Sequence, residues 1–195
     1  DCIVHNSLYM PSDDYAQRAS AYLEQCIKEQ DSSGGIVECR INGMPAGIGD
    51  PVFQKLDACL ARALMSIGAV KGIEIGDGFE AAASKGSINN DAFLNCQGNI
   101  CKKTNHSGGT LGGLSDGSPI ILRAAIKPTP SISKPQQTVT REGEETTITI
   151  TGRHDPVIVP RAVVVVESMA AITIADLLMT GMSSNMENLL KIYQK

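Results

Sequence analysis

Three side chains with complementary acid–base chemistry follow one another at Arg153, His154 and Asp155. The guanidinium of Arg153 can bind a carboxylate or phosphate through a planar fork of donors, and Asp155 can act as a base beside it. Pro156 favours an extended backbone at Asp155, which directs this carboxylate. The segment therefore predicts a site that binds an anion and accepts a proton.

A second candidate site is the loop that follows an apolar run. Prolines 128 and 130 stiffen a segment that presents the ammonium of Lys127 and the hydroxyls of Thr129 and Ser131. Such groups on a rigid frame suit phosphate binding. Taken alone, the loop favours a rigid turn that carries an incidental lysine, and both interpretations stay open.

A third candidate is the glycine-rich segment from Asn105 to Gly117, which holds the pairs Gly108-Gly109 and Gly112-Gly113. Backbone N–H groups without side chains could approach a planar cofactor or a phosphate closely. A flexible glycine turn is the alternative. The segment lacks both the G-x-G-x-x-G pattern and the lysine of a P-loop, so neither a dinucleotide nor a nucleoside triphosphate is implied.

Composition limits the kind of protein that carries these sites. The chain has 195 residues, 42% hydrophobic content and a net charge of −4, with no Trp and only three Phe. We expect a single folded domain over residues 1–195 that binds neither nucleic acid nor membrane. The first residue is not Met, so we also expect the chain to be a fragment of something longer.

Six cysteines are spaced irregularly, and none forms a C-x-x-C pair of the zinc-ribbon kind. We therefore expect no metal site and reduced, mostly buried thiols in a cytosolic protein.

Periodicity predicts the elements that would position the candidate sites. We expect a helix from the cap at Ser12 to about Asp31, a strand over 36–41, a helix opened by Pro51, and a strand over 69–75. A loop-rich stretch over 87–118 precedes a strand over 120–126 and another over 146–151. A short amphipathic helix ends the chain after residue 183.

The stretch Ala162–Met179 is almost wholly apolar, with Glu167 and Asp176 as its only charges. A membrane helix is one interpretation. Internal acids and the absence of a basic flank favour a buried core helix or a subunit contact instead.

Five separate segments resemble, in the same order, the chorismate synthase family. They are Asn42–Gly49, Met65–Gly76, Asn105–Gly117, Lys127–Ile132 and Gly152–Asp155. The resemblance covers nearly the whole chain but only about the C-terminal half of the family pattern. The family's N-terminal part, with two catalytic histidines and several substrate arginines, has no counterpart in this sequence.

The resemblance implies an α+β fold in which helices are layered between antiparallel β-sheets, and a cytoplasmic homotetramer. It implies a lyase of the shikimate pathway, which leads to the aromatic amino acids. Such an enzyme removes phosphate from 5-enolpyruvylshikimate 3-phosphate by an anti 1,4-elimination that requires reduced FMN, although no net redox change occurs.

The resemblance also implies roles for individual residues. Asp155 would be catalytic and accept the proton from the flavin N5, with Arg153 beside it. The implied cofactor-binding residues are Gly68, Ala69, Gly112, Lys127, Pro128, Thr129, Pro130, Ser131 and Arg153.

Four residues depart from the family pattern: Gly68, Asp116, Val157 and Val164. Asp116 stands where Asn is commoner and would add negative charge near an anionic ligand. Val164 stands where proline often occurs, so we expect the long apolar helix to begin after Ala162.

Two other functions remain open. One is a non-catalytic flavin-binding or oligomerising fragment that lacks the N-terminal histidines. The other is a plain module that binds small anions, which explains the lysine and arginines but not the glycine-rich segment.

Overall fold

The structure is a computed structural model that describes residues 2–152 and 155–193. The chain divides into two compact units. The smaller unit contains Asp1–Ile36 and Ala125–Val163, and the larger contains Val37–Ala124 and Val164–Lys195. This division into units does not decide whether residues 1–195 form a single domain, so that expectation stays a prediction.

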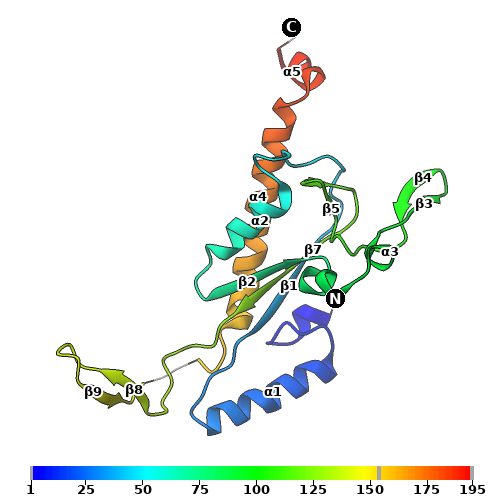
Figure 1. The fold of residues 1–195 in the computed structure, drawn as a ribbon. Helices are drawn as coiled ribbons and strands as arrows, with labels where there is room; N and C mark the ends of the chain where they lie inside the picture. The colour runs from blue at the N-terminus through cyan, green and yellow to red at the C-terminus, as the bar shows by residue number, and fades with distance from the viewer. Residues whose placement is uncertain (1, 153–154, 194–195) are drawn as a thin grey trace. The chain divides into compact units, whose positions relative to one another are not determined.

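Helices and short antiparallel hairpins make up both units (Figure 1). This combination confirms the expected α+β class. The elements in chain order are η1 (Cys2–His5), α1 (Asp13–Lys28), β1 (Gly35–Ile41), α2 (Leu56–Met65), β2 (Val70–Ile75), η2 (Gly78–Ala83), α3 (Gly86–Asn89), β3 (Phe93–Cys96), β4 (Asn99–Lys102), β5 (Thr110–Leu111), β6 (Leu114–Ser115), β7 (Ile120–Ile126), β8 (Gln136–Val139), β9 (Glu145–Ile148), α4 (Val159–Ser183) and α5 (Met186–Tyr193).

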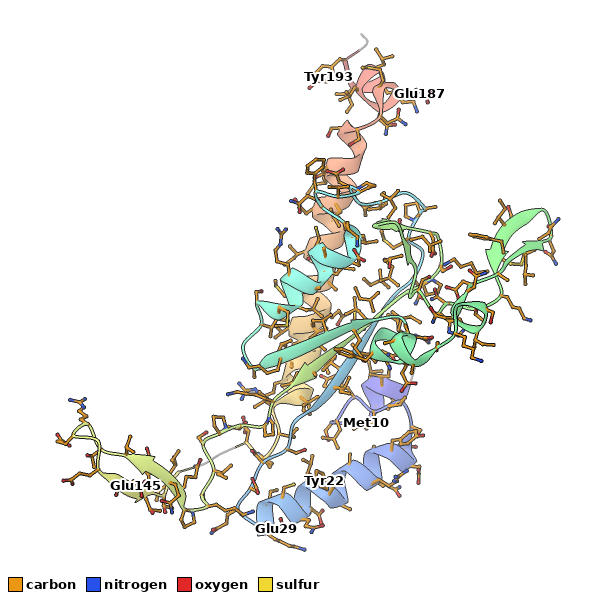
Figure 2. All side chains as sticks on the ribbon, viewed as in Figure 1. Met10, Tyr22, Glu29, Glu145, Glu187 and Tyr193 are labelled. Carbon is orange, nitrogen blue, oxygen red and sulfur yellow. A yellow bond between two sulfur atoms is a disulfide. The ribbon has the colours of Figure 1, made fainter. Side chains whose placement is uncertain are left out.

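Helix α1 begins where its cap predicts. The Ser12 hydroxyl accepts a hydrogen bond from the N–H of Tyr15 at 3.4 Å, and Asp13 and Asp14 occupy the positive first turn. The helix ends at Lys28, close to the predicted stop. Tyr22 of this helix and Met10 before it, both labelled in Figure 2, line an apolar cavity of about 240 Å³ in the smaller unit.

A three-stranded sheet in the order β1-β7-β2 carries the core. Alternate residues of β7 are buried, with Ile120, Leu122 and Ala124 at most 1% exposed. Helix α2 contacts β2 and buries Leu60 and Leu64. The strands predicted over 36–41, 69–75 and 120–126 are therefore confirmed within one residue of their ends.

The prediction that Pro51 opens the second helix is wrong. Reciprocal backbone hydrogen bonds of 2.9 Å join Asp50 and Gln54 and close a small loop. Val52, inside that loop, has a φ of +74°, which is incompatible with a helix. The helix accordingly begins at Leu56.

Helix α4 is longer than predicted, and the expectation that it begins after Ala162 is wrong. It starts at Val159, because Pro160 falls in the first turn, where a missing N–H costs no hydrogen bond. Its buried stripe is Val166, Ala170, Ile174 and Leu177.

The exposed surface of α4 includes large apolar side chains, with Val164 59%, Ile172 64% and Met179 65% accessible, beside the charged Glu167 and Asp176. By length and composition alone, the helix could cross a membrane. One such helix is weak evidence for a membrane span. The expectation of a buried core helix thus holds only for the face of α4 that carries the buried stripe.

The stretch 87–118 is more ordered than predicted, because it contains the antiparallel hairpins β3-β4 and β5-β6. The strand predicted over 146–151 pairs with β8 but ends at Ile148. Glu145 in Figure 2 marks this exposed hairpin. The C-terminal amphipathic helix is confirmed as α5.

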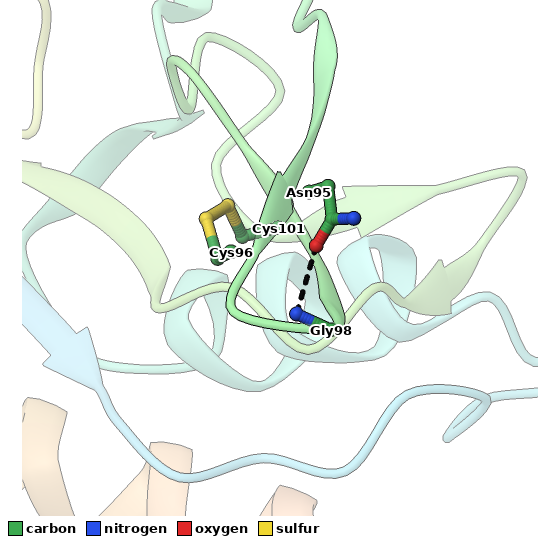
Figure 3. The surroundings of a disulfide bond; sticks show 4 residues. All are labelled: Asn95, Cys96, Gly98 and Cys101. Carbon is green, nitrogen blue, oxygen red and sulfur yellow. Dashed lines mark hydrogen bonds between the residues drawn. A yellow bond between two sulfur atoms is a disulfide. The ribbon is translucent and has the colours of Figure 1, made fainter.

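The expectation of reduced thiols throughout is wrong for one pair. Cys96 and Cys101 form a disulfide across the β3-β4 hairpin, whose turn is closed by a 2.8 Å hydrogen bond from the Gly98 N–H to the Asn95 side chain (Figure 3). Cys26, Cys39 and Cys59 are free, and Cys26 and Cys59 are buried as expected. Burial, assisted by the charge of Glu167, raises the pKa of Cys39.

Candidate functional site

The proline loop begins directly after β7 and presents its lysine to solvent. Lys127 is exposed, and within the described ranges it forms no ion pair. The hydroxyl oxygen of Thr129 is buried and has no hydrogen-bond partner in the described part of the chain. A buried hydroxyl without a partner costs free energy, so this loop suits a ligand oxygen that would bond to Thr129.

A turn that sequence reasoning treated only as a helix stop holds this loop in place. Its residues, Asp31 to Gly34, follow α1. The Ser32 hydroxyl donates a 2.6 Å hydrogen bond to the carbonyl of Thr129, and the Asp31 carboxylate lies 2.6 Å from the Lys134 ammonium. Hydrogen bonds from Lys134 and from the Ser32 N–H lower the pKa of Asp31.

The same turn contacts the segment that carries Asp155. The N–H of Ser33 donates a 2.8 Å hydrogen bond to the carbonyl of Pro156, and Ser33 forms a parallel β-bridge with Val157. Gly34 fits closely, because a Cβ there would lie 2.4 Å from the carbonyl oxygen of Ile126. The turn thus joins two candidate site segments that are far apart in sequence.

The carboxylate of Asp155 pairs with Arg161 at 2.6 Å through Oδ2. The two side chains are 43% and 77% exposed, so the pair contributes little to stability. Arg161 was given no role in the sequence analysis. The expected partner Arg153 and its neighbour His154 lie outside the described residues.

Gly68 and Ala69 lie in the larger unit, between α2 and β2. Ala69 has a φ of +70°, a left-handed conformation that is costly for a residue with a Cβ. Gly68 faces open space, since a Cβ there would meet nothing within 4 Å. The backbone at Gly68 is therefore accessible, as a close ligand contact would require.

The two glycine pairs of the glycine-rich segment serve different purposes. A Cβ at Gly108 would lie 2.3 Å from the N of Gly76, so the first pair permits close packing of two backbones. Gly112 and Gly113, with φ of +60° and +92°, form the turn between β5 and β6. A Cβ at Gly112 would meet nothing within 4 Å, which leaves space beside this residue for a ligand.

Asp116 does not add free negative charge beside this turn, contrary to the expectation from sequence. It pairs with Lys102, whose Nζ also lies 3.5 Å from Asp91 and bonds Ser107 at 2.9 Å. The three charged side chains are 4–7% exposed. Burial would raise the pKa of Asp116, but the hydrogen bonds from Lys102 and Ser118 hold it below its usual range.

His106 takes part in a neighbouring polar network. Its Nδ1 lies 2.6 Å from the Asp77 carboxylate, which also accepts a bond from Asn89 at 3.2 Å. The backbone N–H of Asp77 in turn donates to the His106 carbonyl at 2.8 Å. This arrangement anchors the start of the glycine-rich segment.

The structure thus places the candidate residues in two groups. Residues 127–131 and Asp155 lie in the smaller unit, where the turn at 31–34 joins them, whereas Gly68, Ala69 and Gly112 lie in the larger unit.

Asp, Ser and Gly in succession are typical of turns that bond their own backbone, and the Ser32 N–H does bond Asp31 Oδ1 at 2.9 Å. That composition could have indicated the turn, but not its distant partners. Among the described residues, no group of three His, Cys, Asp or Glu side chains is arranged to hold a metal ion.

The chain is similar in sequence to known proteins of one family. The family model for chorismate synthase matches residues 2–179. Chorismate synthase of Agathobacter rectalis is 63% identical over 193 residues, covering 99% of this chain and 53% of that protein. The enzyme of Lachnoclostridium phytofermentans is 65% identical over 189 residues, covering 96% of this chain and 52% of that protein.

The fold gives the same result. A crystal structure of chorismate synthase matches with a TM-score of 0.78 and 31% identity, covering 97% of this chain and 50% of that one. The chain spans about half the length of these relatives. By sequence and by fold, the chain belongs to the chorismate synthase family.

Proposed function

We propose that this chain forms the C-terminal half of a chorismate synthase, which converts 5-enolpyruvylshikimate 3-phosphate to chorismate and phosphate. Membership of the family and identities of 63% and 65% to two such enzymes support the proposal. We also propose that the complete enzyme is a cytoplasmic homotetramer of the shikimate pathway.

The residues present fit an FMN cofactor. The observation that carries this assignment is the buried, unpartnered hydroxyl of Thr129, in a loop whose Lys127 is exposed and unpaired within the described ranges. Together with Pro128, Pro130 and Ser131, these residues would hold the flavin in the proline loop. Gly68, Ala69 and Gly112 would offer open backbone, and Arg153 would contact flavin and substrate anions.

Reduced FMN, when bound, would lend an electron to the substrate as phosphate leaves and recover it with the hydrogen that the substrate loses, which would explain why a reaction without net redox change needs it. Asp155 would accept the proton of the flavin N5 through its carboxylate. Arg161 holds Oδ2, while Oδ1 accepts no hydrogen bond from any described residue and remains available. Pro156 restrains the backbone at Asp155, so the acceptor keeps its direction.

Turnover needs groups that this sequence lacks, because the family's two catalytic histidines have no counterpart here. A non-catalytic flavin-binding or oligomerising piece is therefore the second candidate for the chain by itself. The exposed apolar face of α4 favours a role in assembly.

The test is chorismate formation without oxygen, with reduced FMN and 5-enolpyruvylshikimate 3-phosphate. The chain alone is compared with the chain mixed with the N-terminal segment of the Agathobacter rectalis relative. We expect activity only in the mixture. If both pieces are folded and associated but the mixture forms no chorismate, the proposed function is wrong.

A further inference from the structure

We infer that Ser32 is a positioning residue that sets the proline loop relative to the Asp155 segment. This inference rests on the proposed function for its meaning in catalysis. Its geometric basis is the turn at 31–34, which contacts both segments within the smaller unit.

The proline loop has little support of its own. Its hydroxyl at Thr129 has no partner in the described part of the chain, and its lysine is exposed. The side-chain hydrogen bond from Ser32 to the Thr129 carbonyl spans 97 positions in sequence and, at 2.6 Å, is short for its type. This bond fixes the peptide unit that follows Thr129, and with it the residue whose hydroxyl would meet the ligand.

One residue later, the turn fixes the other segment through its backbone. Ser33 donates its N–H to the carbonyl of Pro156, directly after Asp155, and among the described residues its own hydroxyl bonds only to the adjacent Gly34 carbonyl at 2.9 Å. Ser32 and Ser33 are adjacent, so the distance between the two attached segments is set by one peptide link. A cofactor held by the loop would meet Asp155 in a fixed orientation only while the Ser32 bond is intact.

Backbone hydrogen exchange tests the geometric part without any ligand. In this chain, Ser32→Ala should raise exchange of the Ile132 N–H, which bonds to the Pro130 carbonyl at 3.0 Å, at least threefold, because a net hydrogen bond of about 1 kcal/mol is lost. Ser32→Thr retains a hydroxyl and should restore most of the protection. Ser33→Ala is the matched control, since it removes a hydroxyl that makes only a local bond, and its exchange should match that of the wild type.

Flavin titration and pH profiles test the catalytic part in the mixture with the N-terminal segment. Ser32→Ala should weaken FMN binding about three- to tenfold and shift the pH dependence of turnover, and Ser32→Thr should reverse both changes. A structural role alone would lower the melting temperature without moving the pH profile.

The outcomes separate the inference from the proposed function. Unchanged exchange in Ser32→Ala overturns the inference. An FMN affinity in the Ser32→Ala mixture equal to that of the wild-type mixture also overturns the inference. A wild-type mixture that binds no flavin overturns the proposed function instead, and the exchange comparison still decides whether Ser32 positions the loop.

Discussion

Asp155 is exposed to solvent, and its only described ion pair, with Arg161, is weak, so its carboxylate is available for proton transfer. We predict that Asp155→Asn in the mixture with the N-terminal segment lowers turnover by about 10²- to 10⁴-fold, the usual contribution of general acid–base catalysis. Flavin affinity should change less than about threefold, because the carboxylate is not an anchor. Turnover and FMN titration measure the two effects.

Glu145→Gln is the control for this prediction, because it neutralises an exposed carboxylate of the same unit, in hairpin β8-β9. It should change neither quantity. Equal losses of turnover and flavin affinity in Asp155→Asn would contradict a proton-accepting role.

Lys127 is the exposed cation of the proline loop. We predict that Lys127→Ala raises the dissociation constant of FMN about ten- to a hundredfold, because a hydrogen bond to a charged group contributes about 1.5–3 kcal/mol. Fluorescence titration of FMN measures the change. Arg141→Ala, which removes an exposed cation of the same unit, should leave the constant unchanged. An unchanged constant in Lys127→Ala would exclude the loop as the phosphate site.

At the scale of elements, the buried ammonium of Lys102 ties the β3-β4 hairpin to the glycine-rich segment. Lys102→Met leaves the carboxylates of Asp91 and Asp116 buried without their cation. We predict a loss of about 3–5 kcal/mol in the free energy of unfolding, measured by urea denaturation. Lys103→Met, at an exposed neighbouring position, should cost much less, and a similar loss in both variants would argue against the buried cluster.

The same cluster predicts how stability depends on pH. Burial would raise the pKa of Asp91, but hydrogen bonds from Ser107, Thr104 and His106 hold it well below its ordinary value of 3.8. Its contribution is therefore fully present above the unfolded-state value and is lost as the pH falls through the lower folded-state value.

We accordingly expect the unfolding free energy to decrease as acid is added below about pH 4. Asp91→Asn should flatten this slope. Urea denaturation at several pH values measures the slope, and an equal slope in the variant and wild type would show that Asp91 is not responsible.

Elements defined by local patterns could be predicted from the sequence, and those defined by distant contacts could not. Helix α1 has its own cap and β7 is a mostly apolar run, so both are found close to their expected limits. The turn at 31–34 depends on partners about a hundred residues away, which no local pattern reveals. Lys102 and Asp116 are only 14 positions apart, but they pair between two hairpins, which no local pattern reveals either. The candidate site segments rest on the resemblance to the family.

At the scale of the whole molecule, much apolar surface in the described residues is exposed. Val164, Ile172 and Met179 lie along α4, and Met186 and Tyr193 continue the pattern on α5. Monomeric soluble proteins rarely expose large contiguous apolar surface, and this chain spans only about half of its relatives. We therefore expect α4 to bind another polypeptide segment, either the N-terminal half of the enzyme or a second copy of the chain.

Ile172→Asp tests this expectation. Ile172 is 64% exposed, so the isolated variant should keep the melting temperature of the wild type within a few degrees. Association should weaken at least tenfold, because a carboxylate would have to be desolvated in an apolar contact. Asp176→Asn, at an exposed position on the same helix, is the control.

Sedimentation velocity of the chain, with and without the N-terminal segment, separates the two partners. A loss only in the mixture assigns the α4 surface to the N-terminal half, and a loss in the chain alone assigns it to self-association. Unchanged association in both cases would mean that the exposed face of α4 is not an interface.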